Sequence, residues 1–148
     1  MSDLQLTALL RALDEHGVDC VVIGGVAVGL HGHARATKDL DIIIDPDPAN
    51  VEREMPLPFE PKSIIEGGGN WLLSTRFGRL DVMQYAEGAP DYETLVERSE
   101  QGAMEGLTSP IRVCSLEDLL AMKRAAGRAV DLGDIERLEL IHRRDDGA

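Results

Sequence analysis

Three aspartates that interrupt apolar stretches have the residue type and spacing for metal chemistry. Asp39 and Asp41 lie in the segment DLDIIID, and because side chains alternate along a strand they point to the same face. Asp81 lies in a second apolar segment, RLDVM. Taken singly, each is an ordinary turn or strand-end carboxylate. Together, if the strands are neighbours, they would repel one another unless Mg²⁺ joins them, as in a two-metal phosphoryl-transfer site.

A glycine pair precedes the aspartates by about fifteen residues. Gly24 and Gly25 stand between an apolar strand and a short helix, where they would let the backbone approach an anion and aim N–H groups at it. Val26 excludes a dinucleotide-binding fingerprint, and Leu30 excludes a P-loop, which requires lysine at that position. A plain tight turn would also use such a pair.

Polar residues between the glycines and the aspartates could serve a phosphate. Arg35, Thr37 and Lys38 would supply positive charge and a hydroxyl, with surface ion pairs as the alternative. His31 and His33 are two residues apart without a third ligand at suitable spacing, which argues against zinc. A helix-end position or a contact to substrate suits them better.

A lysine occupies the apolar stripe of a predicted C-terminal helix. Lys123 follows three leucines at helical spacing, so it either extends to solvent or reaches a buried anion such as a triphosphate. Arg128 lies near the start of the last helix. Asp131 is expected to be the N-cap of that helix, and Asp134 is expected in its first turn.

Apolar periodicity predicts alternating strands and helices. Helices are expected over 3–16, 26–32, 91–98, 115 onward and 131–142, with another starting at Pro48, and strands over 18–23, 40–44, 62–66, 71–77, 79–85 and 111–114. Ser115 should cap its helix. The expected fold class is α/β (α+β), a mixed central β-sheet flanked by helices, in one domain over residues 1–148 with closing helices 115–142 packed on the core.

Composition limits the function classes. The formal net charge is −12 with 43% hydrophobic residues, so a core can form, but nonspecific coating of nucleic acid is disfavoured. No apolar run reaches the roughly 20 residues that span a bilayer, and the N-terminal residues are too polar for a signal peptide. Cys20 and Cys114 are isolated thiols. A cytoplasmic protein without membrane association is expected.

The combined pattern resembles the polymerase-beta-like nucleotidyltransferase superfamily. The resemblance rests on the glycine pair, HGHARATKDLDI and LDVM, while the ending SLEDLLAMKRAAGRAVDLGDIERL is similar to small bacterial nucleotidyltransferases akin to abortive-infection and toxin–antitoxin transferases. It implies that Asp39 and Asp41 bind two Mg²⁺ ions (or Mn²⁺) and that Asp81 binds the catalytic one. Gly25 and Val26 stand where many members carry a hydroxyl residue, and Val130 where related sequences often have a basic one.

The predicted activity is therefore Mg²⁺-dependent transfer of NMP from an NTP to an acceptor hydroxyl, with release of pyrophosphate. The resemblance implies that Gly24 and Gly25 hold the triphosphate and makes Lys123 a candidate phosphate contact. The full predicted nucleotide-binding set is Gly24, Gly25, Arg35, Thr37, Lys38, Lys123 and Arg128. The acceptor is a small molecule, tRNA or protein, and a partner protein or homodimer is expected, in a toxin–antitoxin or defence setting. Two alternatives stay open: a metal-dependent phosphoesterase, and a non-catalytic nucleotide-binding or partner module.

Overall fold

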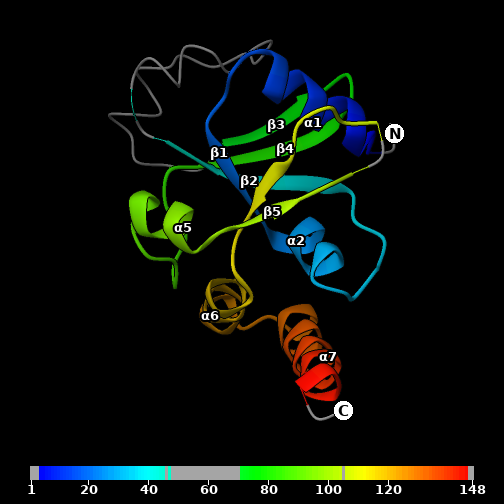
Figure 1. The fold of residues 1–148 in the computed structure, drawn as a ribbon, viewed down its shortest axis with the longest axis vertical. Helices are drawn as coiled ribbons and strands as arrows, with labels where there is room; N and C mark the ends of the chain where they lie inside the picture. The colour runs from blue at the N-terminus through cyan, green and yellow to red at the C-terminus, as the bar shows by residue number, and fades with distance from the viewer. Residues whose placement is uncertain (1–3, 46, 48–70, 105, 147–148) are drawn as a thin grey trace.

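The computed structural model describes residues 4–45, 47, 71–104 and 106–146 (Figure 1). The helix predicted from Pro48, the strand predicted over 62–66 and the glycines at 67–69 lie outside these described residues. Among the residues that are described, no helix is both long and apolar enough to cross a membrane.

Six strands form one mixed sheet in the order β3-β4-β2-β1-β6-β5. The strands are β1 (Cys20–Ile23), β2 (Asp39–Ile44), β3 (Trp71–Thr75), β4 (Gly78–Met83), β5 (Glu100–Gly102) and β6 (Ile111–Val113). Neighbours pair antiparallel except β2 with β4 and β1 with β6, which are parallel. The predicted mixed sheet is confirmed, and with it the α+β fold class.

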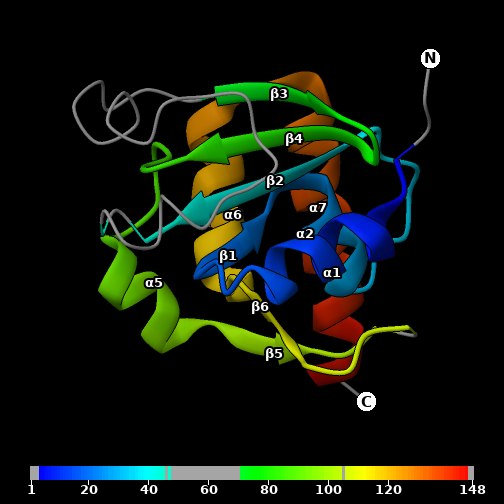
Figure 2. The same ribbon diagram turned by 90° about the horizontal axis from the view of Figure 1, so that it is seen from above.

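Helices cover both faces of the sheet. They are α1 (Leu6–Glu15), α2 (Gly24–Leu30), α5 (Tyr92–Arg98), α6 (Leu116–Ala126) and α7 (Ala129–Asp146). Figures 1 and 2 show α2, α6 and α7 on one face and α1 on the other. The two closing helices pack against each other, and α6 also contacts α2. The face that carries α2, α6 and α7 is the one that matters for the site.

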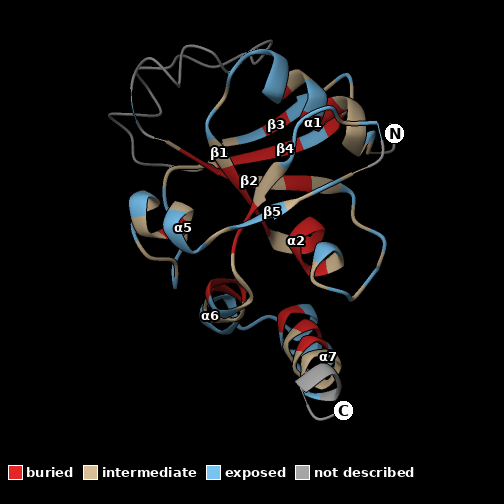
Figure 3. Ribbon diagram, in the orientation of Figure 1, coloured by how far each residue is buried: buried red, intermediate tan, exposed pale blue. Residues whose placement is uncertain are grey.

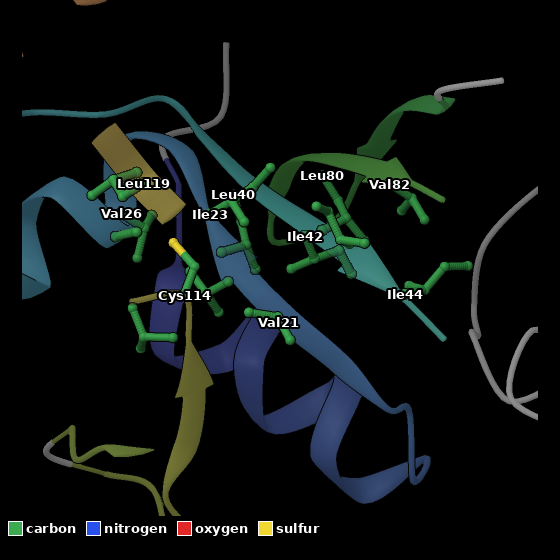
Figure 4. Packing of buried hydrophobic residues seen from close by; sticks show 14 of the residues in the cluster. Val21, Ile23, Val26, Leu40, Ile42, Ile44, Leu80, Val82, Cys114 and Leu119 are labelled. Atoms are coloured by element: carbon green, nitrogen blue, oxygen red, sulfur yellow. The ribbon is translucent and has the colours of Figure 1, made fainter. Parts of the chain in front are cut away.

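The core lies on the central strands. Ile42 of β2 and Val82 of β4 are fully buried, as is Leu119, which α6 contributes (Figure 4). Figure 3 shows buried residues gathered along the central strands and on one side of α6 and α7. Branched aliphatic side chains fill this space, as expected in a chain with only five aromatic residues. The strands that carry the acidic residues are thus the best-anchored part of the sheet.

Several local predictions need correction. Gly24 and Gly25 do not form a turn ahead of a helix; they are the first two residues of α2. The last helix begins at Ala129, so Asp131 is its third residue rather than its N-cap, and its carboxylate accepts from the N–H of Arg128. The short edge strand β5 was not predicted, because EQG carries no apolar alternation. Ser115 does cap α6, accepting from the N–H of Asp118.

Candidate functional site

The three aspartates meet on one face of the sheet. β2 and β4 run parallel with Asp41 opposite Asp81 and Asp39 opposite Arg79, so these four residues face the same side. One oxygen of each carboxylate lies within 4.8 Å of those of the other two. The predicted convergence of Asp39, Asp41 and Asp81 is confirmed. It follows from strand alternation combined with the parallel pairing.

Ionisation of Asp39 and Asp41 is unfavourable without a cation. Burial, reinforced by the charge of Asp39 and a hydrogen bond with Asp81, raises the pKa of Asp41 to about 8. Burial and contact with Asp81 also raise the pKa of Asp39. Asp81 is itself buried and accepts a hydrogen bond of 3.0 Å from Arg79 Nε. Oxygen ligands that repel one another in this way suit a divalent cation.

Gly24 lets α2 approach the acidic residues. Its φ is +68°, and a Cβ built there would overlap Oδ2 of Asp41. Gly25 is tight as well, since its Cβ would lie 3.0 Å from Oγ1 of Thr37. A side chain at Gly24 would therefore displace the Asp41 carboxylate and force an unfavourable backbone conformation.

Replacing Gly24 with alanine should destabilise the protein and weaken its binding of Mg²⁺. The matched control is Gly29→Ala in the same helix, where an added Cβ meets no atom within 4 Å. That change should be neutral or stabilising by up to about 1 kcal/mol. Urea unfolding and Mg²⁺ titration of both variants measure the difference, and equal stabilities would show that the close approach of Gly24 to Asp41 is not required.

Across from the aspartates, Lys123 is held by two carboxylates of α7. Its ammonium lies 3.1 Å from Asp131 Oδ1 and 3.1 Å from Asp134 Oδ2, and the lysine side chain is only 6% exposed. The prediction that Lys123 points inward is correct, but its partners in the structure are these aspartates. Two of its three N–H donors are engaged, which leaves one for a ligand.

Two arginines complete this ion-pair network. Arg35 donates from Nε and Nη2 to Asp134 at 3.0 Å each, and Arg128 donates from Nε to Asp131 at 2.7 Å. Burial opposes ionisation of Asp131, but the hydrogen bonds from Arg128 and Lys123 outweigh it and lower its pKa to about 2. Burial likewise opposes ionisation of Asp134, and Arg35 and Lys123 lower its pKa. Both carboxylates are therefore ionised at neutral pH.

The acidic group and the cations line one cleft of about 1070 Å³. Its charged lining comprises Arg35, Arg79, Lys123 and Arg128 against Asp39, Asp41, Asp81, Glu87 and Asp131. Gly24, Gly25 and Thr37 line it as well. A smaller cavity of about 180 Å³ lies between α1 and the strands β1 and β6 and contains none of the residues predicted to act. The larger cleft is the candidate functional site.

The structure also places the remaining predicted residues. Thr37 Oγ1 donates to the carbonyl of Asp39, whereas Lys38 is exposed and does not line the cleft. His31 Nε2 hydrogen-bonds to the carbonyl of Cys114, so it serves the junction of α2 and β6. His33 Nε2 lies 3.9 Å from Asp134 Oδ1. Neither histidine lines the cleft.

Sequence reasoning missed Arg79 and the role of Asp134. Arg79 stands two residues before Asp81, so strand alternation already placed both on one face and could have indicated their pairing. Asp134 follows Asp131 by three residues, which puts both on one side of α7. Their lysine partner lies on another helix, and no local pattern indicated it.

The pH dependence of stability should report on Asp41. Because its pKa is about 8 in the folded protein and about 4 when unfolded, the native state binds more protons, and stability present below pH 4 is lost as the pH rises through 8. Without Mg²⁺, we expect the stability of the wild-type protein relative to Asp41→Asn to fall between pH 5 and pH 9. Urea unfolding at each pH measures this, and a constant difference would contradict the burial of Asp41.

The comparisons with known proteins concern the whole chain. The model of a family described as a nucleotidyltransferase of unknown function, DUF6036, matches residues 3–146. Among solved structures, the crystal structure of a "putative nucleotidyltransferase" from Thermotoga maritima is similar, with a TM-score of 0.49 and 17% sequence identity over 99% of this chain and 98% of that chain. No curated protein matches the chain significantly.

Proposed function

Because the chain belongs to the DUF6036 family of nucleotidyltransferases of unknown function, we propose that it transfers NMP from an NTP to an acceptor hydroxyl in a Mg²⁺-dependent reaction. The observation that carries the proposal is that three converging carboxylates share one cleft with four cationic side chains, of which Lys123 is buried. Carboxylates on one side and phosphate-binding cations on the other are the parts that phosphoryl transfer requires.

The donor set fits a hard divalent cation. Asp39, Asp41 and Asp81 offer only oxygen ligands, and the raised pKa values of Asp39 and Asp41 reflect a repulsion that such a cation would relieve. In this proposal Asp39 and Asp41 hold two Mg²⁺ ions and Asp81 one of them. A bound metal ion would neutralise charge on the triphosphate and lower the pKa of the acceptor hydroxyl.

The protein's own groups would orient the substrates. The acceptor oxygen forms a bond to the α-phosphorus, the bond from that phosphorus to its bridging oxygen breaks, and the electron pair leaves with pyrophosphate. Asp81 takes the proton of the acceptor hydroxyl, and Arg79 holds its carboxylate in place at 3.0 Å. Gly25 exposes backbone to the triphosphate at the start of α2, and the last free N–H of Lys123 donates to it.

The charge of the cleft favours joint binding of metal and nucleotide. Four cationic and five acidic side chains line it, so without metal it offers no net attraction to a triphosphate. Divalent ions at the three aspartates would reverse that balance. We therefore expect an NTP to bind with Mg²⁺ present and only weakly without it.

One experiment separates the proposal from its alternatives. The protein is incubated with Mg²⁺, each NTP in turn and a cell extract as the source of acceptors, and the released phosphate is identified. Pyrophosphate release that depends on the extract supports nucleotidyl transfer. Orthophosphate release instead indicates a phosphoesterase, and Mg²⁺-dependent NTP binding without turnover indicates a binding module.

The acceptor and the biological setting remain part of the proposal. The net charge of −12 favours a small molecule or a protein over a long nucleic acid as acceptor, with tRNA as the nucleic acid to test. A partner protein or a second copy of the chain, and a toxin–antitoxin or defence role, stay predictions. If the NTP carries a label on its α-phosphate, the molecule of the extract that becomes labelled would identify the acceptor class directly.

A further inference from the structure

One aromatic side chain is exposed in the cleft. Tyr85 is 58% exposed, in a chain with only five aromatic residues, and it lines the same cleft as the three aspartates. It has no part in the acidic group or in the ion-pair network. An exposed aromatic ring in a polar cleft suits a planar ligand group that can stack on it.

Tyr85 lies two residues beyond the end of β4, and the direction of this strand sets its position. Asp81, Met83 and Tyr85 are alternate residues and all line the cleft, whereas Val82 between the first two is fully buried. Tyr85 follows Asp81 by four positions, which is at most about 13 Å of extended chain. That length is compatible with one nucleotide that has its phosphates at Asp81 and its base at Tyr85.

The turn after Tyr85 packs directly against α6. The N–H of Ala89 bonds to the carbonyl of Ala86 at 3.0 Å, and Gly88 has a φ of +91°. A Cβ on Gly88 would lie 2.6 Å from the backbone carbonyl oxygen of Ala121, so only glycine permits this approach. The turn is therefore anchored to a helix, and Tyr85 is not the tip of an unsupported loop.

The same helix contributes apolar side chains to the cleft. Leu119, Met122 and Ala126 of α6 give it an apolar lining, while the neighbouring Lys123 turns toward the carboxylates of α7. The backbone of Met122 is close to Gly88, which follows Tyr85 by three positions. The cleft thus combines the charged Lys123 with apolar side chains of α6 and the ring of Tyr85.

We propose that Tyr85, together with the apolar residues that α6 adds to the cleft, forms the seat for the base of the bound nucleotide. This inference rests on the proposed function, since the phosphates of the same nucleotide would lie at the aspartates. Glu87 lines the cleft beside this seat, and a carboxylate accepts but does not donate hydrogen bonds. Glu87 can therefore accept a hydrogen bond from an amino group or a ring N–H at the edge of a bound base.

The test compares nucleotides with inorganic tripolyphosphate, which lacks a base. With Mg²⁺ present, Tyr85→Ala should weaken binding of ATP, GTP and CTP about tenfold or more and leave tripolyphosphate binding unchanged. Tyr85→Phe should retain nucleotide affinity. Calorimetric titration of each probe measures this. Equal affinities of Tyr85→Ala and the wild-type protein for every NTP, or an equal loss for NTP and tripolyphosphate, would overturn the proposal.

Two further variants test whether the turn after Tyr85 supports nucleotide binding. Gly88→Ala should lower NTP affinity without changing tripolyphosphate affinity, because it shifts the turn from α6. The matched control is Leu132→Ala, which removes a large exposed side chain of α7 outside the cleft and should change neither.

The outcome also separates this inference from the proposed function. If NTP binding requires Mg²⁺ and Asp41 but is unchanged in Tyr85→Ala, the proposed base seat is wrong and the proposed function is unaffected. Absence of Mg²⁺-dependent NTP binding in the wild-type protein would contradict both. Loss of NTP affinity in Tyr85→Ala with tripolyphosphate binding intact would support both.

Discussion

Replacing both Asp39 and Asp41 with asparagine is expected to abolish Mg²⁺-dependent nucleotide binding and lower nucleotidyl transfer more than about 100-fold. Even an outer-shell partner of a metal ligand costs about 10–100-fold when it is removed, and this change removes two direct ligands. The fold should persist, because the two side chains contribute no apolar contact to the core. The melting temperature without metal should rise, since the repulsion that raises the pKa of Asp41 is relieved.

Calorimetric titration with Mg²⁺ and NTP, paired with thermal unfolding, measures both effects. The matched control is Asp14→Asn with Glu15→Gln, which removes two exposed carboxylates of α1 and leaves the cleft unchanged. A double variant at positions 39 and 41 that binds Mg²⁺–NTP as the wild-type protein does would show that the acidic group is not the metal site.

Lys123→Ala should produce the largest loss of stability among single changes in the cleft. Breaking a buried ion pair by removing one partner costs about 3–5 kcal/mol. Asp131 keeps Arg128 and Asp134 keeps Arg35, so we expect the lower end of that range. The same change should weaken binding of an NTP more than that of an NMP, because the lost N–H would serve the outer phosphates.

The control for this prediction is Arg124→Ala on the same helix. Arg124 pairs with Glu139 at 2.8 Å, but both side chains are exposed, so the expected loss is below about 1 kcal/mol. Urea unfolding of the two variants gives the comparison. Equal losses of stability in the two variants would indicate that solvent screens the charge of Lys123 as it does that of Arg124. That result would contradict the burial of Lys123.

A rescue experiment isolates the charge effect. Lys123→Met combined with Asp131→Asn and Asp134→Asn removes the buried charges together and should recover much of the stability lost in Lys123→Met. The free energies of unfolding of the two proteins decide the point. No recovery would mean that Lys123 acts through packing rather than through its carboxylate partners.

The acidic part of the site was predictable because it depends on local rules. Alternation along a strand puts Asp39 and Asp41 on one face, and the apolar segment around Asp81 indicated a strand that could lie beside them. The pairing itself is long-range, but a central apolar strand must have neighbours. The mixed sheet followed from the same reasoning.

The rest of the site depends on contacts between distant segments. The sequence indicated that Lys123 faces inward, yet its partners Asp131 and Asp134 lie beyond a break between two helices. Arg35 also reaches α7 from a loop that precedes β2. The contact between Gly24 and Asp41 requires the register of β1 against β2, which places Ile23 opposite Asp41. Sequence patterns do not encode these distances.

The start of α7 shows how a familiar local signal can mislead. Asp131 is a residue type favoured at an N-cap, and the stretch before it contains glycine. In the structure Gly127 instead ends α6 with a φ of +63°, and α7 begins two residues later. The carboxylate of Asp131 is then directed to Lys123 and Arg128. A tertiary ion pair thus determined its role.

The most direct test of the central claim follows the α-phosphate of an NTP. The wild-type protein, with Mg²⁺ and an extract of small molecules, tRNA and protein, should transfer an α-label to one acceptor class and release one pyrophosphate for each label. Asp81→Asn should slow transfer more than about 100-fold, while Asp91→Asn, at the exposed N-cap of α5, should leave it unchanged. Transfer by Asp81→Asn at the wild-type rate, or no labelled acceptor with any NTP, would contradict the account.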